Sequence, residues 1–185
     1  GTYGKSKSSV IYKCTCCDLQ VLDPRSSLSL SDYQDSSYRD SLDQSFSEQE
    51  HYSSHAHLIK YPLQILDPTI LHNKKLIDVG CAGGILLDAV RGLTSTVVGI
   101  EPCINWHPLL ASKDIPTFSS STQAFDSHGS TFDIAISHQV IEHVDDPYTF
   151  LREIFSLLRP GGIALISTPN LDDILFSALP SHFPS

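Results

Sequence analysis

The sequence predicts an α/β fold in which helices cover a parallel β-sheet, and three observations support it. From Lys75 onward, short apolar runs bounded by Gly or Pro alternate with stretches of helical periodicity, which is typical of βαβ units. A length of 185 residues suits one domain with a packed core. The hydrophobic content of 41% is that of a folded domain, and no apolar run approaches the roughly 20 residues that cross a bilayer. We therefore expect no membrane association.

The first 71 residues are expected to form smaller elements. Residues 10–22 alternate well enough for a short strand, a CxxC turn and a second short strand. The Ser-rich residues 26–54 carry apolar side chains at helical spacing, which predicts a loosely packed helical arm. Leu and Ile recur along residues 53–71, which indicates a helix that is interrupted near Pro62 and ends around Asp67.

The rest of the chain is expected to carry the sheet. Each expected strand is a short apolar run, and each connection is long enough for a crossover helix. The expected strands are 76–80, 96–101, 117–120, 132–137 and 162–168, and the expected helices are 85–93, 104–112, 148–158 and 171–179.

Charge and cysteine content exclude several classes of function. The formal charge is -9, from 21 acidic residues against 12 Lys and Arg. Nucleic-acid binding depends on basic side chains that neutralise phosphates, so we expect no nucleic-acid partner. The five cysteines are odd in number and three lie between residues 14 and 17, which is a poor basis for disulfides. Since no signal-peptide pattern opens the chain either, we expect a reducing, cytoplasmic location.

A glycine-rich turn follows the first expected strand of the sheet. The run LIDVGCAGG leads from a buried strand into a turn and then a helix, which is the context of nucleotide sites. The dinucleotide fingerprint G-x-G-x-x-G fails here, because Ala82 and Ile85 occupy its second and third glycine positions. Asp78 would also face the pyrophosphate of a dinucleotide. A cationic ligand would instead be attracted to this carboxylate.

A second acid lies at the end of the next expected strand. Glu101 follows Gly80 by about 20 residues, the spacing at which an acid accepts hydrogen bonds from ribose hydroxyls. The turn and Glu101 together therefore favour a ligand that contains a ribose and carries positive charge.

Four segments, in order and in spacing, resemble the signatures of the class I S-adenosyl-L-methionine (SAM)-dependent methyltransferases. They are DVGCAGG (78–84), VGIEP (98–102), FDIAISHQVIEHVDDP (132–147) and LRPGG (158–162). SAM carries a sulfonium and an ammonium group and no phosphate, which suits Asp78. The resemblance implies a Rossmann-like parallel sheet with strand order 3-2-1-4-5. It also implies that the cofactor is SAM.

The resemblance also implies roles for single residues. The methionine end of SAM would be held by Asp78 and the turn residues, the ribose by Glu101, and the adenine would lie beside Pro102. One of Ser121, Thr122 and Gln123 would face the adenine, and His138 and Gln139 would line the cavity beside the methyl group. The full set of expected cofactor-binding residues is Asp78, Gly80, Cys81, Ala82, Gly83, Gly84, Glu101, Pro102, Thr122, His138 and Gln139.

Two histidines are candidates for the catalytic base. An oxygen or nitrogen nucleophile has to lose a proton, and imidazole suits that task near neutral pH. The first candidate is His143, which follows the fourth expected strand, and the second is His138 at the end of that strand. The alternative is that His143 and Glu142 only cap the turn. Some relatives hold a metal through Glu-x-x-Glu-His, but here the first position is Gln139, and a neutral amide is a poor ligand for a hard cation. We expect no catalytic metal.

Residues 12–24 resemble the second half of a small zinc ribbon that precedes the methyltransferase domain in some family members. Only Cys14 and Cys17 are in CxxC register, whereas a structural zinc needs four ligands. His51, His55 and His57 are further candidates, but we expect them to be solvated, and zinc is not the expected state. The ribbon's first half would lie before Gly1, and the family adds two further strands after the fifth. We therefore expect a fragment that is short at both ends.

The sequence therefore predicts a cysteine knuckle with a helical arm or lid at 1–52 and a SAM-binding domain, truncated at its carboxyl end, at 53–185. Tyr33, Tyr38 and Tyr52 are expected to anchor the arm, with a role in the lid as the alternative. The leading hypothesis is methyl transfer to an O or N of a small molecule. The alternatives are a catalytically inactive methyltransferase-like binding module and an NAD-dependent oxidoreductase, which Asp78 disfavours. The oligomeric state is not predicted.

Overall fold

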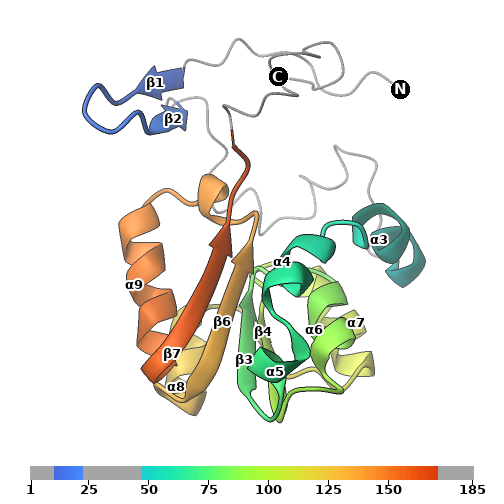
Figure 1. The fold of residues 1–185 in the computed structure, drawn as a ribbon. Helices are drawn as coiled ribbons and strands as arrows, with labels where there is room; N and C mark the ends of the chain where they lie inside the picture. The colour runs from blue at the N-terminus through green and yellow to red at the C-terminus, as the bar shows by residue number, and fades with distance from the viewer. Residues whose placement is uncertain (1–10, 23–46, 171–185) are drawn as a thin grey trace. The chain divides into compact units, whose positions relative to one another are not determined.

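The sheet is parallel and has five strands. The computed structural model describes residues 11–22 and 47–170 of the chain. Strand order is β5-β4-β3-β6-β7, which confirms the expected order 3-2-1-4-5. All four pairs of neighbouring strands run parallel (Figure 1). The strands are β3 (Lys75–Val79), β4 (Thr96–Ile100), β5 (Thr117–Phe118), β6 (Phe132–His138) and β7 (Leu158–Ser167).

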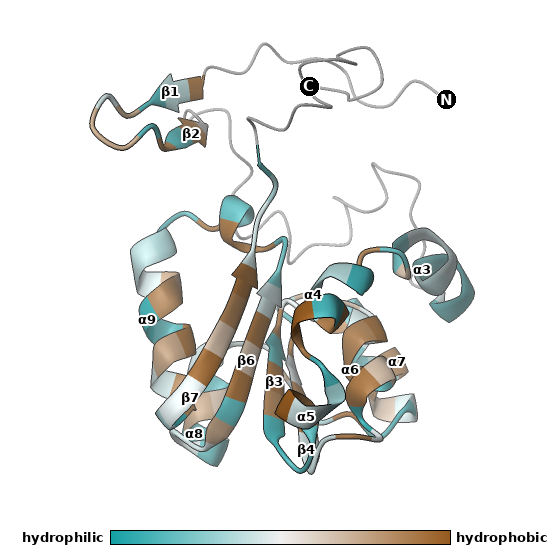
Figure 2. Ribbon diagram, viewed as in Figure 1, coloured by the Kyte–Doolittle hydropathy of each residue, from teal (hydrophilic) through white to brown (hydrophobic). Residues whose placement is uncertain are grey.

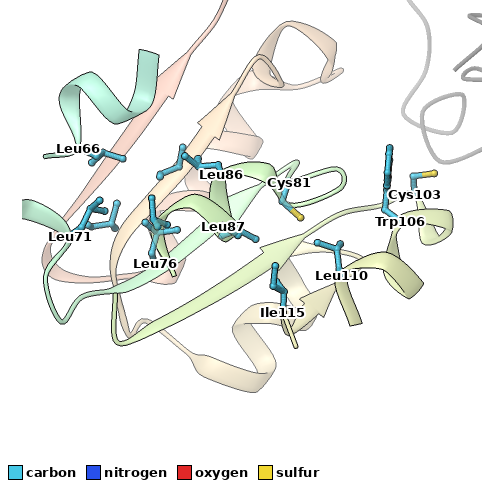
Figure 3. Packing of buried hydrophobic residues seen from close by; sticks show 13 residues of the cluster. Leu66, Leu71, Leu76, Cys81, Leu86, Leu87, Cys103, Trp106, Leu110 and Ile115 are labelled. Atoms are coloured by element: carbon cyan, nitrogen blue, oxygen red, sulfur yellow. The ribbon is translucent and has the colours of Figure 1, made fainter. Parts of the chain in front are cut away.

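Helices cover both faces of this sheet, and each face has its own hydrophobic cluster. On one face, α5 (Pro68–Leu71), α6 (Ile85–Val90) and α7 (His107–Ser112) contribute to the first cluster, part of which Figure 3 shows. On the other face, α8 (Ser121–His128) and α9 (Pro147–Leu157) contribute to the second cluster. Side chains alternate along β3 because strand periodicity is two: Leu76 belongs to the first cluster and Ile77 to the second. Figure 2 shows how hydrophobic residues concentrate on the strands and on α6.

The helix starts follow from local sequence. Asp146 caps α9, accepting hydrogen bonds from the backbone N–H groups of Tyr148 and Thr149, and Pro147 occupies the first turn. Ser120 caps α8 in the same way through the N–H of Gln123. A short 3-10 turn, η1 (Ile104–Trp106), precedes α7, so the expected helix 104–112 divides into two parts.

The segment before the sheet differs from expectation. Instead of one interrupted helix over 53–71, the structure has α3 (Glu48–His55), α4 (Lys60–Ile65) and α5. Pro62 does not interrupt α4, because it lies in the first turn, where its missing N–H has no helical partner to lose. The boundary expected between residues 52 and 53 lies inside α3 and stays a prediction. Most of the expected arm, with Tyr33 and Tyr38, and the expected helix 171–179 lie outside the described residues.

The amino-terminal hairpin belongs to a separate unit. Strands β1 (Ile11–Lys13) and β2 (Gln20–Leu22) pair antiparallel, as expected. Asp18 has a φ of 59°, and the N–H of Cys14 donates to the carbonyl oxygen of Leu19 to close the turn. Hydrogen bonds from the backbone of Cys16 and Cys17 lower the pKa of the Cys14 thiol.

Residues 11–22 and 47–170 contain neither a cluster of metal-ligating side chains nor a membrane-spanning helix. In these segments no group of three or more His, Cys, Asp or Glu side chains is arranged to hold a metal ion. No helix there has the length and apolar character needed to span a bilayer.

Candidate functional site

The glycine-rich turn lies at the carboxyl end of β3 and is tied to the end of β4. The N–H groups of Gly80 and Cys81 both donate to the carbonyl oxygen of Ile100, at 2.8 and 3.1 Å, and the N–H of Gly84 donates to the carbonyl oxygen of Cys81 at 2.8 Å. Hydrogen bonds within the chain therefore hold the shape of the turn.

Two glycines of the turn cannot be replaced without strain. Gly80 has a φ of +84°, and a Cβ there would lie 2.4 Å from Cγ2 of Val140. Gly84 has a φ of +77°, and a Cβ there would lie 2.6 Å from Cδ2 of Leu110. Ala82, which stands where the family commonly has a glycine, also has a positive φ, 45°. That conformation favours glycine, so the common glycine at this position has a clear physical reason.

Glu101 holds the Ala82 conformation in place. Its carboxylate is 8% exposed, and its Oε2 accepts a hydrogen bond from the N–H of Ala82 at 2.8 Å. Its Oε1 accepts from the N–H of Cys103, also at 2.8 Å. Each carboxylate oxygen can accept two hydrogen bonds, and ribose hydroxyls are donors of the kind that such an oxygen accepts. Glu101 thus connects the loops that follow β3 and β4.

Asp78 is a buried carboxylate beside the turn. Its side chain is 5% exposed, and none of the described residues donates a hydrogen bond to it. Burial and the negative charge of Glu101 raise the pKa of Asp78 to about 7. An ionised carboxylate without a donor is costly in such a place, and a bound cation would remove that cost.

The neighbouring thiol is not reactive. Burial, with the nearby charges of Asp78 and Glu101, raises the pKa of Cys81 well above its ordinary value. Cys81 therefore stays neutral, and its Sγ would lie 2.6 Å from a Cβ at Gly99. Its role is packing of the turn on β4.

A pocket of about 80 Å³ lies over the turn. It brings together the turn, the end of β6 and the helices before the sheet. Its lining residues are His51, His55, Leu58, Ile59, Pro62, Asp78, Gly80, Cys81, Ile85, Leu86 and His138. Five of these precede the sheet, and sequence reasoning assigned none of them to the cofactor site.

His51 is the residue of this set that reaches the turn directly. It is 6% exposed, which contradicts the expectation that it is solvated. The N–H of Gly83 donates to its Nε2 at 3.2 Å, and its ring lies 4.6 Å from the Trp106 ring. The segment EQEHYSSH has no apolar periodicity that could have indicated a buried face.

His138 lies where the sequence placed it, at the end of β6 and in the pocket wall. Its Nδ1 pairs with Oγ of Ser167, whereas its buried Nε2 has no hydrogen-bond partner among the described residues. Burial lowers the pKa of His138, although the charge of Glu142 opposes this. The imidazole is therefore neutral near pH 7.

Other expected site residues do not line the pocket. His143 lies in the 3-10 turn η2 (Ile141–His143) and is exposed, as are Gln139 and Thr122. Pro102 is half-buried directly after β4. Their roles stay predictions, whereas Asp78, Gly80, Cys81 and His138 are brought together in one pocket.

Comparison with known proteins identifies the relatives of this chain. A family model described as a methyltransferase domain matches residues 49–184. The ubiquinone biosynthesis O-methyltransferase of Dinoroseobacter shibae is 32% identical over 117 residues, which cover 60% of this chain and 47% of that protein. The protein of the same name from Ruegeria pomeroyi is 33% identical over 102 residues, or 52% of this chain and 41% of that protein. The chain therefore spans less than half the length of these relatives.

Solved structures agree on the fold. A SAM-dependent methyltransferase from Aquifex aeolicus superposes with a TM-score of 0.56 at 16% identity, covering 75% of each chain. At this identity the likeness establishes the common α/β architecture.

Proposed function

This chain belongs to the methyltransferase-domain family, and from that premise we propose that it binds SAM and transfers the methyl group to an oxygen or nitrogen of a small molecule. The observation that carries the proposal is Asp78, a buried carboxylate without a hydrogen-bond donor among the described residues, set beside a glycine-rich turn. Such a group suits a cationic cofactor and opposes a pyrophosphate.

The residues present fit this cofactor. Asp78 would face its positive charge, the turn from Gly80 to Gly84 would pack against its methionine end, and Glu101 would accept from its ribose. When bound, SAM supplies a methyl group already activated by the sulfonium. The chain then has to align the acceptor and exclude water.

We assign the base to His138 ahead of His143. His138 lines the pocket and its pKa is lowered by burial, so the neutral imidazole can accept a proton. With the Nδ1 proton donated to Ser167, the lone pair would lie on Nε2, the atom without a partner in the described residues. His143 is exposed and does not line this pocket.

For the acceptor we propose a hydroxyl group on a small molecule, with an amine as the second choice. The curated relatives are named as O-methyltransferases of ubiquinone biosynthesis, and the formal charge of -9 disfavours nucleic acid. We further propose a cytoplasmic location, which the five free cysteines support.

Calorimetric titration tests cofactor binding. We expect micromolar binding of SAM and none of NAD. In Glu101→Gln a side-chain NH₂ group replaces one of the two oxygens that accept from the N–H groups of Ala82 and Cys103. Two donors then face each other, so SAM affinity should fall on the order of 100-fold. Glu153→Gln, on α9, is the matched control and should bind like the unaltered chain. A folded chain that binds NAD and not SAM would overturn the proposal.

Transfer of radiolabelled methyl groups to a metabolite extract distinguishes an enzyme from a binding module. We expect labelled small molecules with the unaltered chain and with the control His72→Asn, whose histidine is exposed. His138→Asn should retain SAM binding and lose most of the transfer, on the order of 100-fold. SAM binding without any labelled product would favour the inactive, partner-binding alternative.

A further inference from the structure

Helix α3 contributes to the cofactor pocket although it buries almost no apolar surface. Its one buried residue is His51, which contacts Gly83 of the turn. The remaining residues of α3 are polar apart from Tyr52. Because hydrophobic burial is the usual force that docks a helix, polar contacts have to contribute to holding α3.

One set of such contacts is a cluster of polar side chains, Glu48, Tyr52, Asp88 and Lys113, which we call the Lys113 cluster. The Nζ of Lys113 lies 2.8 Å from Oε1 of Glu48 and 2.6 Å from Oδ2 of Asp88. It also donates to the Tyr52 hydroxyl, which in turn donates to Asp88. Glu48 and Tyr52 lie one turn apart on α3, whereas Asp88 is on α6 and Lys113 follows α7. One ammonium group therefore joins α3 to the sheet-covering helices.

The Lys113 ammonium is positioned for this role. Its side chain is 10% exposed, and Arg91 donates to the Lys113 carbonyl oxygen at 2.7 Å, which fixes the backbone. Burial lowers the pKa of Lys113, but hydrogen bonds to Asp88, Glu48 and Tyr52 outweigh it and raise the pKa above its ordinary value. Lys113 is charged at any physiological pH, and removal of a partly buried charge leaves its partners uncompensated.

Residues from His51 to Pro62 form one wall of the pocket over the turn, which has a volume of about 80 Å³. Small-molecule pockets measure roughly 300–1000 Å³, so this pocket has room for only part of a cofactor. Outward movement of these helices would widen it, and their return would cover the bound ligand.

We propose that Lys113 is a positioning residue that fastens α3 across the glycine-rich turn, and that release of this contact admits the cofactor. The inference rests on the proposed function for its second part only. The fastening of α3 involves only side chains of this chain. His51 is the group whose position depends on it, because it adjoins Tyr52 and contacts Gly83.

Hydrogen exchange in the full chain tests the fastening without any ligand. Lys113→Met removes the charge at nearly constant length, Lys113→Arg keeps the charge, and Lys74→Met removes an ammonium 4.0 Å from Asp133, remote from α3. We expect amides of residues 48–56 to exchange on the order of tenfold faster in Lys113→Met. We expect Lys113→Arg to restore most of the protection and Lys74→Met to leave it unchanged.

Stopped-flow dissociation of S-adenosyl-L-homocysteine tests the second part. In Lys113→Met its release should accelerate on the order of tenfold. Unchanged exchange over residues 48–56 in Lys113→Met overturns the inference, and so does an equal loss of protection over residues 75–90, which would signify general destabilisation. If no variant binds the probe while exchange over 48–56 still rises, the fastening stands and the proposed function fails.

Discussion

The centre of the sheet and its β7 edge are packed to very different degrees. On β3, the central strand, every residue from Leu76 to Val79 is buried, and α6 buries four of its six residues. At the β7 edge, α9 buries only Ile154 and Leu157 of its eleven, and β7 buries only Leu158. Large apolar side chains stay exposed there, among them Tyr148 at 68% and Phe155 at 78%. The shape of the proposed cofactor side is therefore fixed by packing, whereas the β7 side is only weakly constrained within the described residues.

The largest expected contrast comes from matched truncations of the two helices. Leu87 on α6 is fully buried, so Leu87→Ala should lower the free energy of unfolding by about 2–5 kcal/mol. Phe155→Ala should change it by less than about 0.5 kcal/mol, because that ring is exposed. Urea titration followed by circular dichroism measures both. Similar losses in the two variants would show that α9 is covered in solution and would remove the contrast.

A second contrast uses two glycines with the same φ. Gly84 and Gly161 both have a φ of +77°. A Cβ at Gly84 would meet Leu110 at 2.6 Å, whereas at Gly161 the nearest atom is Nη1 of Arg159 at 3.8 Å. Gly161→Ala should cost about 1 kcal/mol from backbone strain alone. Gly84→Ala should cost about 1–3 kcal/mol more, because steric overlap is added. Equal costs, measured by the same titration, would mean that the turn yields to the added methyl group.

The smallest expected effect is a pH dependence that distinguishes two aspartates. The pKa of Asp78 is raised to about 7 by burial and by Glu101, so its charge appears only as the pH approaches neutrality. SAM affinity should therefore rise roughly five- to tenfold between pH 6 and 7.5. Asp78→Asn should abolish the rise, and Asp133→Asn, on β6, should keep it. Calorimetric titration with SAM across this pH range measures the rise. A rise retained in Asp78→Asn would contradict its attribution to the ionisation of Asp78.

The pH dependence of the free energy of unfolding independently tests the direction of the pKa shift at each aspartate. At Asp78 the folded chain binds more protons than the unfolded chain between about pH 4 and 7, so this contribution to stability falls as the pH rises. At Asp133 burial is outweighed by hydrogen bonds from the Lys75 N–H and from Arg159, which lower its pKa. Its contribution is therefore present above about pH 4 and lost as the pH falls. The two Asn variants should change the pH slope in opposite directions.

Much of the fold could be predicted because its signals are local. Apolar runs such as 76–80 and 132–137 mark buried strands, and the turn glycines mark positions where backbone conformation excludes a side chain. The expected strand order, which the resemblance implied, is confirmed. Strand β7 begins at Leu158 and not at the expected residue 162; Gly161 and Gly162 fall at the register shift in its pairing with β6.

The contributions of α3 could not be predicted, because they depend on contacts between distant positions. His51 meets Gly83, and Lys113 meets Glu48 and Tyr52, across 32 to 65 residues of sequence. Neither contact leaves a periodic pattern in the segments that make it. The choice between His138 and His143 had the same difficulty, since which histidine faces a pocket depends on the loop after β6.

The two hydrogen bonds that Glu101 accepts have a consequence for the energetics of ligand recognition. Through contacts within the chain itself, this carboxylate connects the loop after β3 to the loop after β4. The conformational entropy of ordering those loops is then lost during folding and not during association. A ligand meets a preorganised surface, and more of its contact energy remains as net affinity.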